Sequence, residues 1–320
     1  PKLFSVFVVF TLVASASNIL AIAQFSPKEI IVASLFLFRF ILYFAFSIVV
    51  SNLLRVKSQD SWINLLLTIG SVFLGLGFAQ LLLFPDLSFL LPLGWDPHAR
   101  RIVATFLDPN FTGAVLVILI NIALSYFLFS KHYIYLVLSS LFFLGIVLTF
   151  SRSSYLALTS SMLIIGLAKS PKLLVAFAVI FTLLSVSVAP VRARIVGAAT
   201  LDNTAQARIE SWGKAVTIFK DNYLFGVGFN TYRFAQSRYG FFDFDNPQGG
   251  HSGSGSDSSL LLVTATTGMV GLGIFLFFLF SIWQILVSKI KSSPVHLATA
   301  ASFIGLLVHS QFVNSLFFPQ

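Results

Sequence analysis

The chain has 320 residues, of which 57% are hydrophobic and only 10% charged, and its formal net charge is +9. A soluble domain carries about 25% charged residues, so this composition excludes a soluble globular protein and indicates a membrane protein. The absence of cysteine excludes disulfides, thiolate nucleophiles and metal sites with cysteine ligands.

Mostly apolar runs, many of them near the roughly 20 residues that a membrane helix needs, follow one another along the chain. They are continuously apolar rather than alternating, which predicts helices and not a barrel. We expect an all-α integral membrane protein, a multi-spanning helical bundle with seven spans in 1–190 and two in 259–320. The predicted spans are 3–24, 29–50, 62–84, 110–130, 133–150, 154–168, 173–190, 259–288 and 295–316.

The second predicted span contains a charged residue, Arg39, in the sequence Phe36-Leu-Phe-Arg-Phe-Ile41. A charge at the bilayer centre costs at least about 2.5–3.5 kcal/mol on insertion scales, and such residues are functional hypotheses. No predicted span has a carboxylate except at its ends. We therefore expect Arg39 either to donate to backbone carbonyls or to line a cavity that holds a phosphate.

A long polar segment, 191–258, separates the seventh and eighth spans, and loops of this size are usually functional or disordered. Within it, 205–220 is predicted to be an amphipathic helix at the membrane surface, because apolar residues recur at helical spacing. These residues are Ile209, Trp212, Val216 and Phe219. Gly226 and Gly228, which follow, predict a tight turn.

Lysine and arginine are concentrated in alternate short loops, which indicates the cytoplasmic side of the membrane. These residues are Lys2, Arg55, Lys57, Lys131, Lys169, Lys172, Lys289 and Lys291. The segment 191–258 then lies on the external, periplasmic face of a multi-pass protein of the cytoplasmic membrane. Much of the net charge follows this topology, so we expect the bilayer, and no nucleic acid, as a partner.

Arg152 follows one span and begins the next on the predicted external face. Its planar guanidinium suits phosphate or carboxylate, although a helix-end arginine can also simply extend to the interface. Asp243-Phe-Asp245 mimics a metal-binding pattern but is too short to be specific. We expect no metal site.

Four segments together resemble the O-antigen ligase/polymerase superfamily, in order and over about residues 100–275. The first two are Arg100-Arg-Ile-Val-Ala-Thr-Phe-Leu-Asp-Pro-Asn110 and Thr149-Phe-Ser-Arg-Ser153. The third comprises Arg208-Ile-Glu-Ser-Trp212 and Lys220-Asp-Asn-Tyr-Leu-Phe-Gly-Val-Gly-Phe-Asn230. The fourth begins with Asp257-Ser-Ser-Leu-Leu261 and ends with Thr267-Gly-Met-Val-Gly271.

The resemblance implies a GT-C-like, metal-independent glycosyltransferase without a cofactor, of the hexosyltransferase type, in cell-surface polysaccharide biosynthesis such as that of lipopolysaccharide. Its donor would be an undecaprenyl-diphosphate-linked glycan, and its acceptor a glycan or glycolipid outside the cytoplasmic membrane. We assign Arg152 and Arg208 to the diphosphate, with Arg101 or Arg100 as auxiliary groups.

The expected general base departs from the pattern of the family's ligases, which have a His-Asn pair eleven residues before the Thr-Gly. Counting back from Gly268 leads to Asp257 and Ser258. Asp257 is therefore the first candidate for the base, and His251, six residues earlier, is the second. The departure favours a polymerase slightly over a ligase. A transporter or flippase of lipid-linked sugars is the alternative function.

Overall fold

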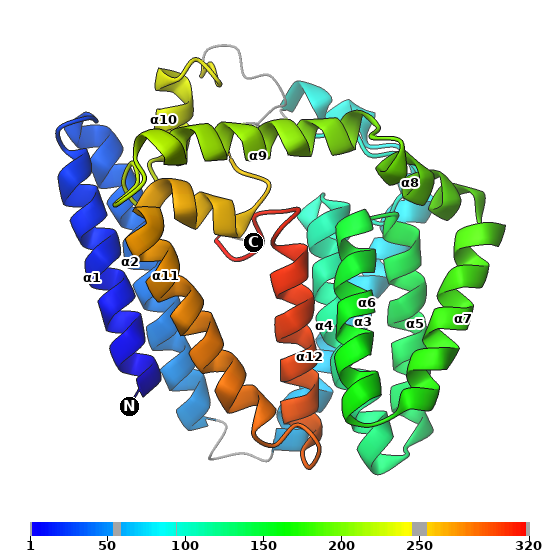
Figure 1. The fold of residues 1–320 in the computed structure, drawn as a ribbon. Coiled ribbons are helices and arrows are strands. Elements are labelled where there is room, and N and C mark those ends of the chain that lie inside the picture. Colours follow the sequence, from blue (N-terminus) through cyan, green and yellow to red (C-terminus); the bar gives the residue numbers. More distant parts are fainter. Residues whose placement is uncertain (1, 54–58, 94, 245–254, 318–320) are drawn as a thin grey trace. The chain divides into compact units, whose positions relative to one another are not determined.

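A computed structural model of the chain describes residues 2–53, 59–93, 95–244 and 255–317. Within these ranges the fold is all-α, as predicted, and a single isolated bridge joins Asp86 to Ala99. Two short 3-10 helices, η1 (Ser88–Leu93) and η2 (Ala104–Phe106), lie between α3 and α4 (Figure 1). The helices are α1 (Lys2–Ala21), α2 (Pro27–Leu53), α3 (Gln59–Leu83), α4 (Pro109–Ser130), α5 (Tyr133–Thr149), α6 (Arg152–Ala168), α7 (Pro171–Ser187), α8 (Ala189–Ala199), α9 (Asn203–Asp221), α10 (Tyr232–Arg238), α11 (Ser259–Val287) and α12 (Pro294–His309).

Helices occupy all nine predicted spans, but they differ in length. Five of the described helices, α1, α2, α3, α4 and α11, are long and apolar enough to cross a membrane. A sixth span results if α7 and α8, which meet at 92°, are counted as one broken span. The helices α5 and α12 are apolar but shorter, and 17 residues of α5 reach about 25 Å. Whether each short helix crosses the bilayer stays a prediction.

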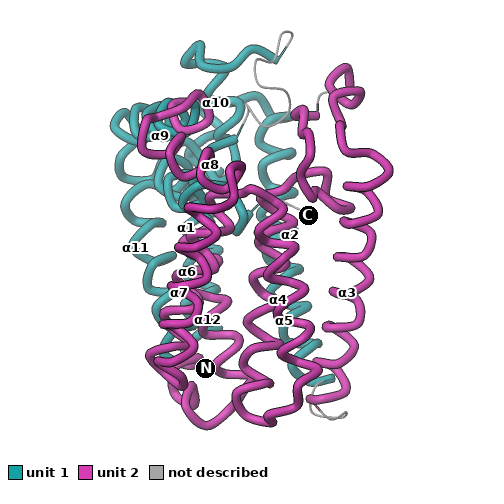
Figure 2. Tube along the Cα trace, turned by 90° about the vertical axis from the view of Figure 1, so that its right-hand side faces the viewer, with its two compact units in different colours: residues 1–58, 207–284, 310–318 teal, residues 59–206, 285–309, 319–320 magenta. Residues whose placement is uncertain are grey.

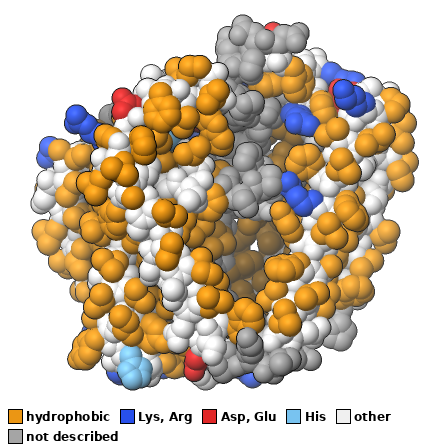
Figure 3. Space-filling model, turned by 180° about the vertical axis from the view of Figure 1, so that it is seen from behind, with side chains coloured by type: hydrophobic (Ala, Val, Ile, Leu, Met, Phe, Trp, Pro, Cys, Tyr) orange, Lys and Arg blue, Asp and Glu red, His pale blue; other side chains and the backbone are white. Residues whose placement is uncertain are grey.

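Hydrophobic side chains cover most of the face shown in Figure 3. Leu82 and Leu167, for example, are 82% and 73% exposed. Large apolar side chains in contact with water would destabilise a soluble protein, whereas a bilayer solvates them. The surface therefore agrees with a multi-spanning membrane protein.

The chain forms two compact units, coloured separately in Figure 2. The first unit comprises 1–58, 207–284 and 310–318, and the second comprises 59–206, 285–309 and 319–320.

In the second unit, α4 is the central helix and packs against α5, α6 and α12. It is buried on most sides because its residues are apolar around the whole helix. Asn121 is the polar exception, and its Nδ2 donates to the Oγ of Ser161 at 3.1 Å and of Ser302 at 3.2 Å. These bonds tie α4 to α6 and α12.

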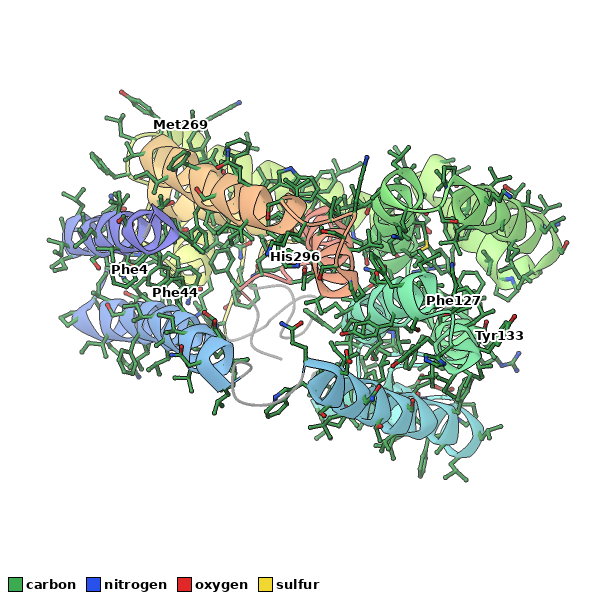
Figure 4. The ribbon with its side chains drawn as sticks, turned by 90° about the horizontal axis from the view of Figure 1, so that it is seen from below. Phe4, Phe44, Phe127, Tyr133, Met269 and His296 are labelled. Atoms are coloured by element: carbon green, nitrogen blue, oxygen red, sulfur yellow. The ribbon has the colours of Figure 1, made fainter. Side chains whose placement is uncertain are left out.

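In the first unit, α1 packs along α2 through phenylalanine rings, among them Phe4 and Phe44 (Figure 4). The tightest pair is Phe7 and Phe44, whose ring centroids are 3.7 Å apart in a stacked arrangement. Stacked aromatic rings hold two helices together where lipid offers no hydrophobic driving force between them.

The helix α11 is broken at Gly268, whose φ of 66° and ψ of −166° are not helical. The turn around Gly226 and Gly228 packs on the break, and its amides bond to α11 carbonyls: Val227 N–H to Ala265 O at 3.0 Å and Gly228 N–H to Thr266 O at 3.0 Å. In return, the Met269 N–H donates to Tyr223 O at 2.8 Å. The turn thus satisfies backbone groups that the break leaves free, as a membrane protein requires. The predicted glycine turn is confirmed, and the predicted span 259–288 is present as α11 with a break at Gly268.

The helix α9 covers the predicted 205–220, and the predicted contact of its apolar stripe with the membrane surface stays a prediction. Ile209 is 49% exposed, while Ala215 and Ile218 are buried in the core of the first unit. The helix therefore packs on protein through the face that contains Trp212, Ala215 and Ile218. Ala215, a small residue, allows the close packing on this face.

Candidate functional site

The turn between α5 and α6 places Arg152 at the first residue of a helix. Phe150 ends α5 in the left-handed conformation, with φ of 47°, and Ser151 caps α6 by accepting a hydrogen bond from the Ser154 amide. The side chain of Arg152 consequently points into the second unit, where it is only 8% exposed.

Two further arginines of the second unit bind the same turn. Arg101 donates from Nε to Thr149 O at 2.8 Å and from Nη2 to Phe150 O at 3.1 Å. Arg194, on α8, donates from Nε to Phe150 O at 3.1 Å. The last carbonyls of a helix carry partial negative charge and attract cations, so the end of α5 fixes Arg101 and Arg194 beside Arg152. We call these three residues the arginine cluster.

Arg152 is paired with one carboxylate, yet its hydrogen-bonding capacity is not exhausted. Its Nη2 donates to Asp202 Oδ1 at 2.9 Å. Its Nε and Nη1 are buried and have no hydrogen-bond partner among the described residues. A buried donor without a partner costs about 1–3 kcal/mol, more when it is charged. An anionic ligand would satisfy these donors.

Asp202 links the arginine cluster to α9, because its Oδ1 also accepts a hydrogen bond from the Ala205 amide at 3.0 Å. Burial alone would raise the pKa of this carboxyl. The hydrogen bonds from Arg152 and Ala205 and the charges of Arg152 and Arg194 outweigh burial and lower the pKa of Asp202 below its ordinary value. Asp202 is therefore ionised at neutral pH and holds Arg152 in place.

We expect the Arg152–Asp202 pair to stabilise the protein only while Asp202 is ionised. Because folding lowers the pKa, the stabilisation is complete above the unfolded-state value of about 3.9 and is lost as the pH falls through the lower folded-state value. An asparagine side chain can still cap α9, so Asp202→Asn removes mainly the charge. Thermal unfolding should show the variant less stable than wild type at about pH 6, and the difference should shrink as the pH falls through the folded-state pKa of Asp202. A difference that persists unchanged at low pH would contradict this.

The start of α4 is bonded to the same turn. Asp108 caps α4 and accepts from the Asn110 amide at 2.6 Å, and Asn110 Oδ1 accepts from Ser151 Oγ at 2.7 Å. His309, fully buried at the end of α12, lies with Nε2 at 3.1 Å from the Asn110 carbonyl oxygen. The amino-terminal ends of α4 and α6 thus lie together, and their dipoles add to the positive potential of the arginine cluster.

The first unit contains the other two main candidates, Arg208 and Asp257. Arg208 lies one turn before Ser211 and Trp212 on α9, on the same face of the helix. The Ser211 hydroxyl accepts a hydrogen bond from the Asp257 amide at 3.0 Å. The structure therefore brings the residue predicted as general base next to the helix face that carries Arg208.

Tyr232 lies buried beside this segment. Burial raises the pKa of its phenol well above the ordinary value, and the charge of Asp257 acts in the same direction. Tyr232 is thus neutral and adds no charge near Asp257.

The remaining sequence candidates lie elsewhere or outside the described residues. Arg100 is exposed, with φ of 54°, and directly precedes Arg101 of the arginine cluster in the chain. Arg39, in the first unit, donates from Nη2 to Phe317 O at 2.8 Å and lies over the Phe36 ring at 4.6 Å. For Arg39 we expected either hydrogen bonds to backbone carbonyls or a cavity that holds a phosphate, and the contact with Phe317 O is of the first kind. His251 falls in 245–254, outside the described residues.

Sequence reasoning missed Arg194 and Asp202. Arg194 and Arg192 form a basic pair in Pro190-Val-Arg-Ala-Arg194, directly after the predicted span 173–190. Such a pair on the predicted external face could have indicated a site. Asp202 precedes α9 in Asp202-Asn-Thr204, a typical helix-capping sequence. Only the folded chain shows that this cap also pairs with Arg152.

Residues 134–276 match the family model described as O-Antigen ligase. This range contains Arg152, Arg194, Asp202, Arg208 and Asp257, and it confirms the predicted resemblance to the O-antigen ligase/polymerase superfamily. No curated protein matches the chain. The match supports an O-antigen ligase/polymerase-like membrane function and, in general terms, glycosyltransferase-like activity.

Proposed function

We propose that this membrane protein, whose residues 134–276 match the O-antigen ligase family, transfers or polymerises a glycan from an undecaprenyl-diphosphate-linked donor. The acceptor is a sugar hydroxyl of a glycan or glycolipid outside the cytoplasmic membrane. The observation that supports this most is the state of Arg152. Its side chain is buried, its Nε and Nη1 have no hydrogen-bond partner among the described residues, and Arg101 and Arg194 bind the same turn.

The arginine cluster fits the leaving group of such a reaction. When the bond between the sugar and the diphosphate breaks, its electron pair goes to a diphosphate oxygen, which gains negative charge. Cations fixed in advance in a water-poor site stabilise this charge without reorganisation, and arginine–phosphate hydrogen bonds are among the strong ones. In our proposal these cations, with Arg208 as a further one, take the role of a metal ion.

The acceptor hydroxyl attacks the anomeric carbon from the face opposite the diphosphate, so the configuration at that carbon inverts. A general base removes the hydroxyl proton, a contribution of about 10²–10⁴-fold. Asp257 is our first candidate for this base and His251 the second. The neutral Tyr232 beside Asp257 leaves the carboxylate as the proton acceptor at that position.

Purified protein incubated with lipid-linked oligosaccharide tests the proposal. We expect free polyprenyl diphosphate to appear together with an enlarged glycan. A ladder of products would identify a polymerase, and a single transfer onto a distinct acceptor a ligase. Movement of intact donor across proteoliposome membranes, without release of polyprenyl diphosphate, would overturn the proposal and favour a flippase.

A further inference from the structure

An apolar crevice lies between α5 and α7 of the second unit, with α4 and α6 at its base. Its volume is about 190 Å³ and it is open on one side. Ser139 and Ser140 also line it, but both hydroxyls donate to the Leu136 carbonyl, at 2.8 and 2.9 Å. The crevice thus offers a ligand hydrocarbon contact and few free polar groups. Its apolar lining includes Leu124, Leu136, Phe143, Met162, Ala176 and Ile180.

The crevice lies at a distance from the arginine cluster within the second unit. On α5, Leu136 is three residues, about 4.5 Å, from the start of the helix. Phe143, the lining residue of α5 closest to the arginine cluster, is still seven residues, about 10 Å, from Phe150. On α7 the lining residues likewise lie in the first ten of the helix.

The turns that begin α5 and α7 carry positive charge and no acid. They contain Lys131 and His132 before α5, and Lys169 and Lys172 around the start of α7. Both turns lie at the same end of the second unit (Figure 1), and the residues flanking the first, Phe127 and Tyr133, are labelled in Figure 4.

These cations differ in their contacts. Lys169 points to the α11–α12 connection, with Nζ 3.8 Å from the Phe129 ring centroid and 3.4 Å from the Lys291 carbonyl oxygen. The Lys131 ammonium lies 5.8 Å from the Phe127 ring centroid, and neither Lys131 nor the exposed Lys172 forms an ion pair with a described residue. Lys172 directly precedes Leu173, which lines the crevice, and Lys131 lies two residues before the start of α5. These two charges are therefore available to a ligand at this end of the second unit.

We propose that this crevice and its lysines bind one anionic phospholipid. An acyl chain lies between α5 and α7, and the phosphate lies at Lys131 and Lys172. The chemistry is complementary at both ends, because hydrocarbon fills the apolar crevice and lysine attracts an anionic headgroup. The site is separate from the arginine cluster and does not depend on the proposed transferase activity.

Native mass spectrometry of the full-length protein in detergent, with phosphatidylglycerol or phosphatidylcholine added, tests this site. We expect wild type to retain one phosphatidylglycerol at least tenfold better than phosphatidylcholine. Lys131→Gln combined with Lys172→Gln should abolish this preference, whereas Lys220→Gln, an exposed lysine of the first unit, should not. Glycerol phosphate alone should bind far more weakly, since it lacks the chain.

A second pair of variants tests the crevice. Ala176→Phe, which fills it, should lose the retained lipid, and Ala178→Phe, on an exposed part of the same helix outside the lining, should keep it. Thermal unfolding checks that both variants fold. Equal retention of the two lipids by wild type, or retention by the Ala176→Phe protein, would overturn the proposal. So would displacement of phosphatidylglycerol by polyprenyl phosphate from this crevice together with a raised donor KM in Ala176→Phe.

Discussion

Arg152→Ala protein should lose glycan transfer by about 10²–10³-fold or more, the effect of removing one preorganised charge-stabilising group from an active site. Arg152 belongs to the arginine cluster and has buried donors with no partner among the described residues. Arg152→Lys should restore only part of the rate, because an ammonium keeps the charge but not the planar fork. The assay is release of polyprenyl diphosphate at equal expression of each variant.

Lys214→Ala is the matched control for Arg152→Ala. Lys214 also forms an ion pair, at 2.8 Å with Glu210, but Glu210 is 68% exposed. An exposed pair of this kind contributes about 0–1 kcal/mol, so transfer should stay near the wild-type rate. Arg208→Ala, by contrast, should impair transfer if Arg208 binds the diphosphate as proposed. Near-normal transfer by the Arg152 and Arg208 variants would contradict these assignments.

Gly268→Ala should destabilise the protein by about 3 kcal/mol or more. The φ and ψ at Gly268 fall in a region that essentially only glycine adopts, which costs other residues about 1–3 kcal/mol. In addition, a Cβ at this position would overlap the Leu224 carbonyl and the Phe225 amide. Either the break in α11 or the turn that packs on it must move. The measurement is thermal unfolding of the protein in detergent, monitored as the loss of the helical circular dichroism signal on heating.

Gly273→Ala provides the control in the same helix. Gly273 is five residues beyond the break, and a Cβ there meets no atom within 4 Å. Alanine is the better helix former by about 0.8–1.0 kcal/mol, so this variant should be as stable as wild type or slightly more so. If both variants unfolded alike, the break at Gly268 would not have the structural role described here.

Much of the fold follows from the sequence because hydrophobic length determines helices in a membrane protein. Uninterrupted apolar runs must form helices that satisfy their own backbone, and every predicted span contains one. Arg152 at the head of α6 was predictable for a related reason. The short polar sequence Ser151-Arg-Ser153 between two apolar runs leaves few other positions for a helix start.

The rest depends on contacts between residues far apart in the chain. Arg101 and Arg152 share the α5–α6 turn although about fifty residues separate them, and Asp202 pairs with Arg152 across the same separation. The break at Gly268 is matched to the turn at Gly226, more than forty residues earlier. No local pattern reports such pairings, since the same glycine would be tolerated in a continuous helix at modest cost.

Binding of polyprenyl diphosphate to purified wild-type and Arg152→Ala proteins tests the central claim most directly, because it requires no turnover. A hydrogen bond to a charged group is worth about 1.5–3 kcal/mol, so the variant should bind about ten- to a hundredfold more weakly. Wild type should also prefer the diphosphate to the monophosphate, and the variant should lose most of that preference. Equal affinity of the two proteins for polyprenyl diphosphate would contradict the assignment of the arginine cluster to the donor.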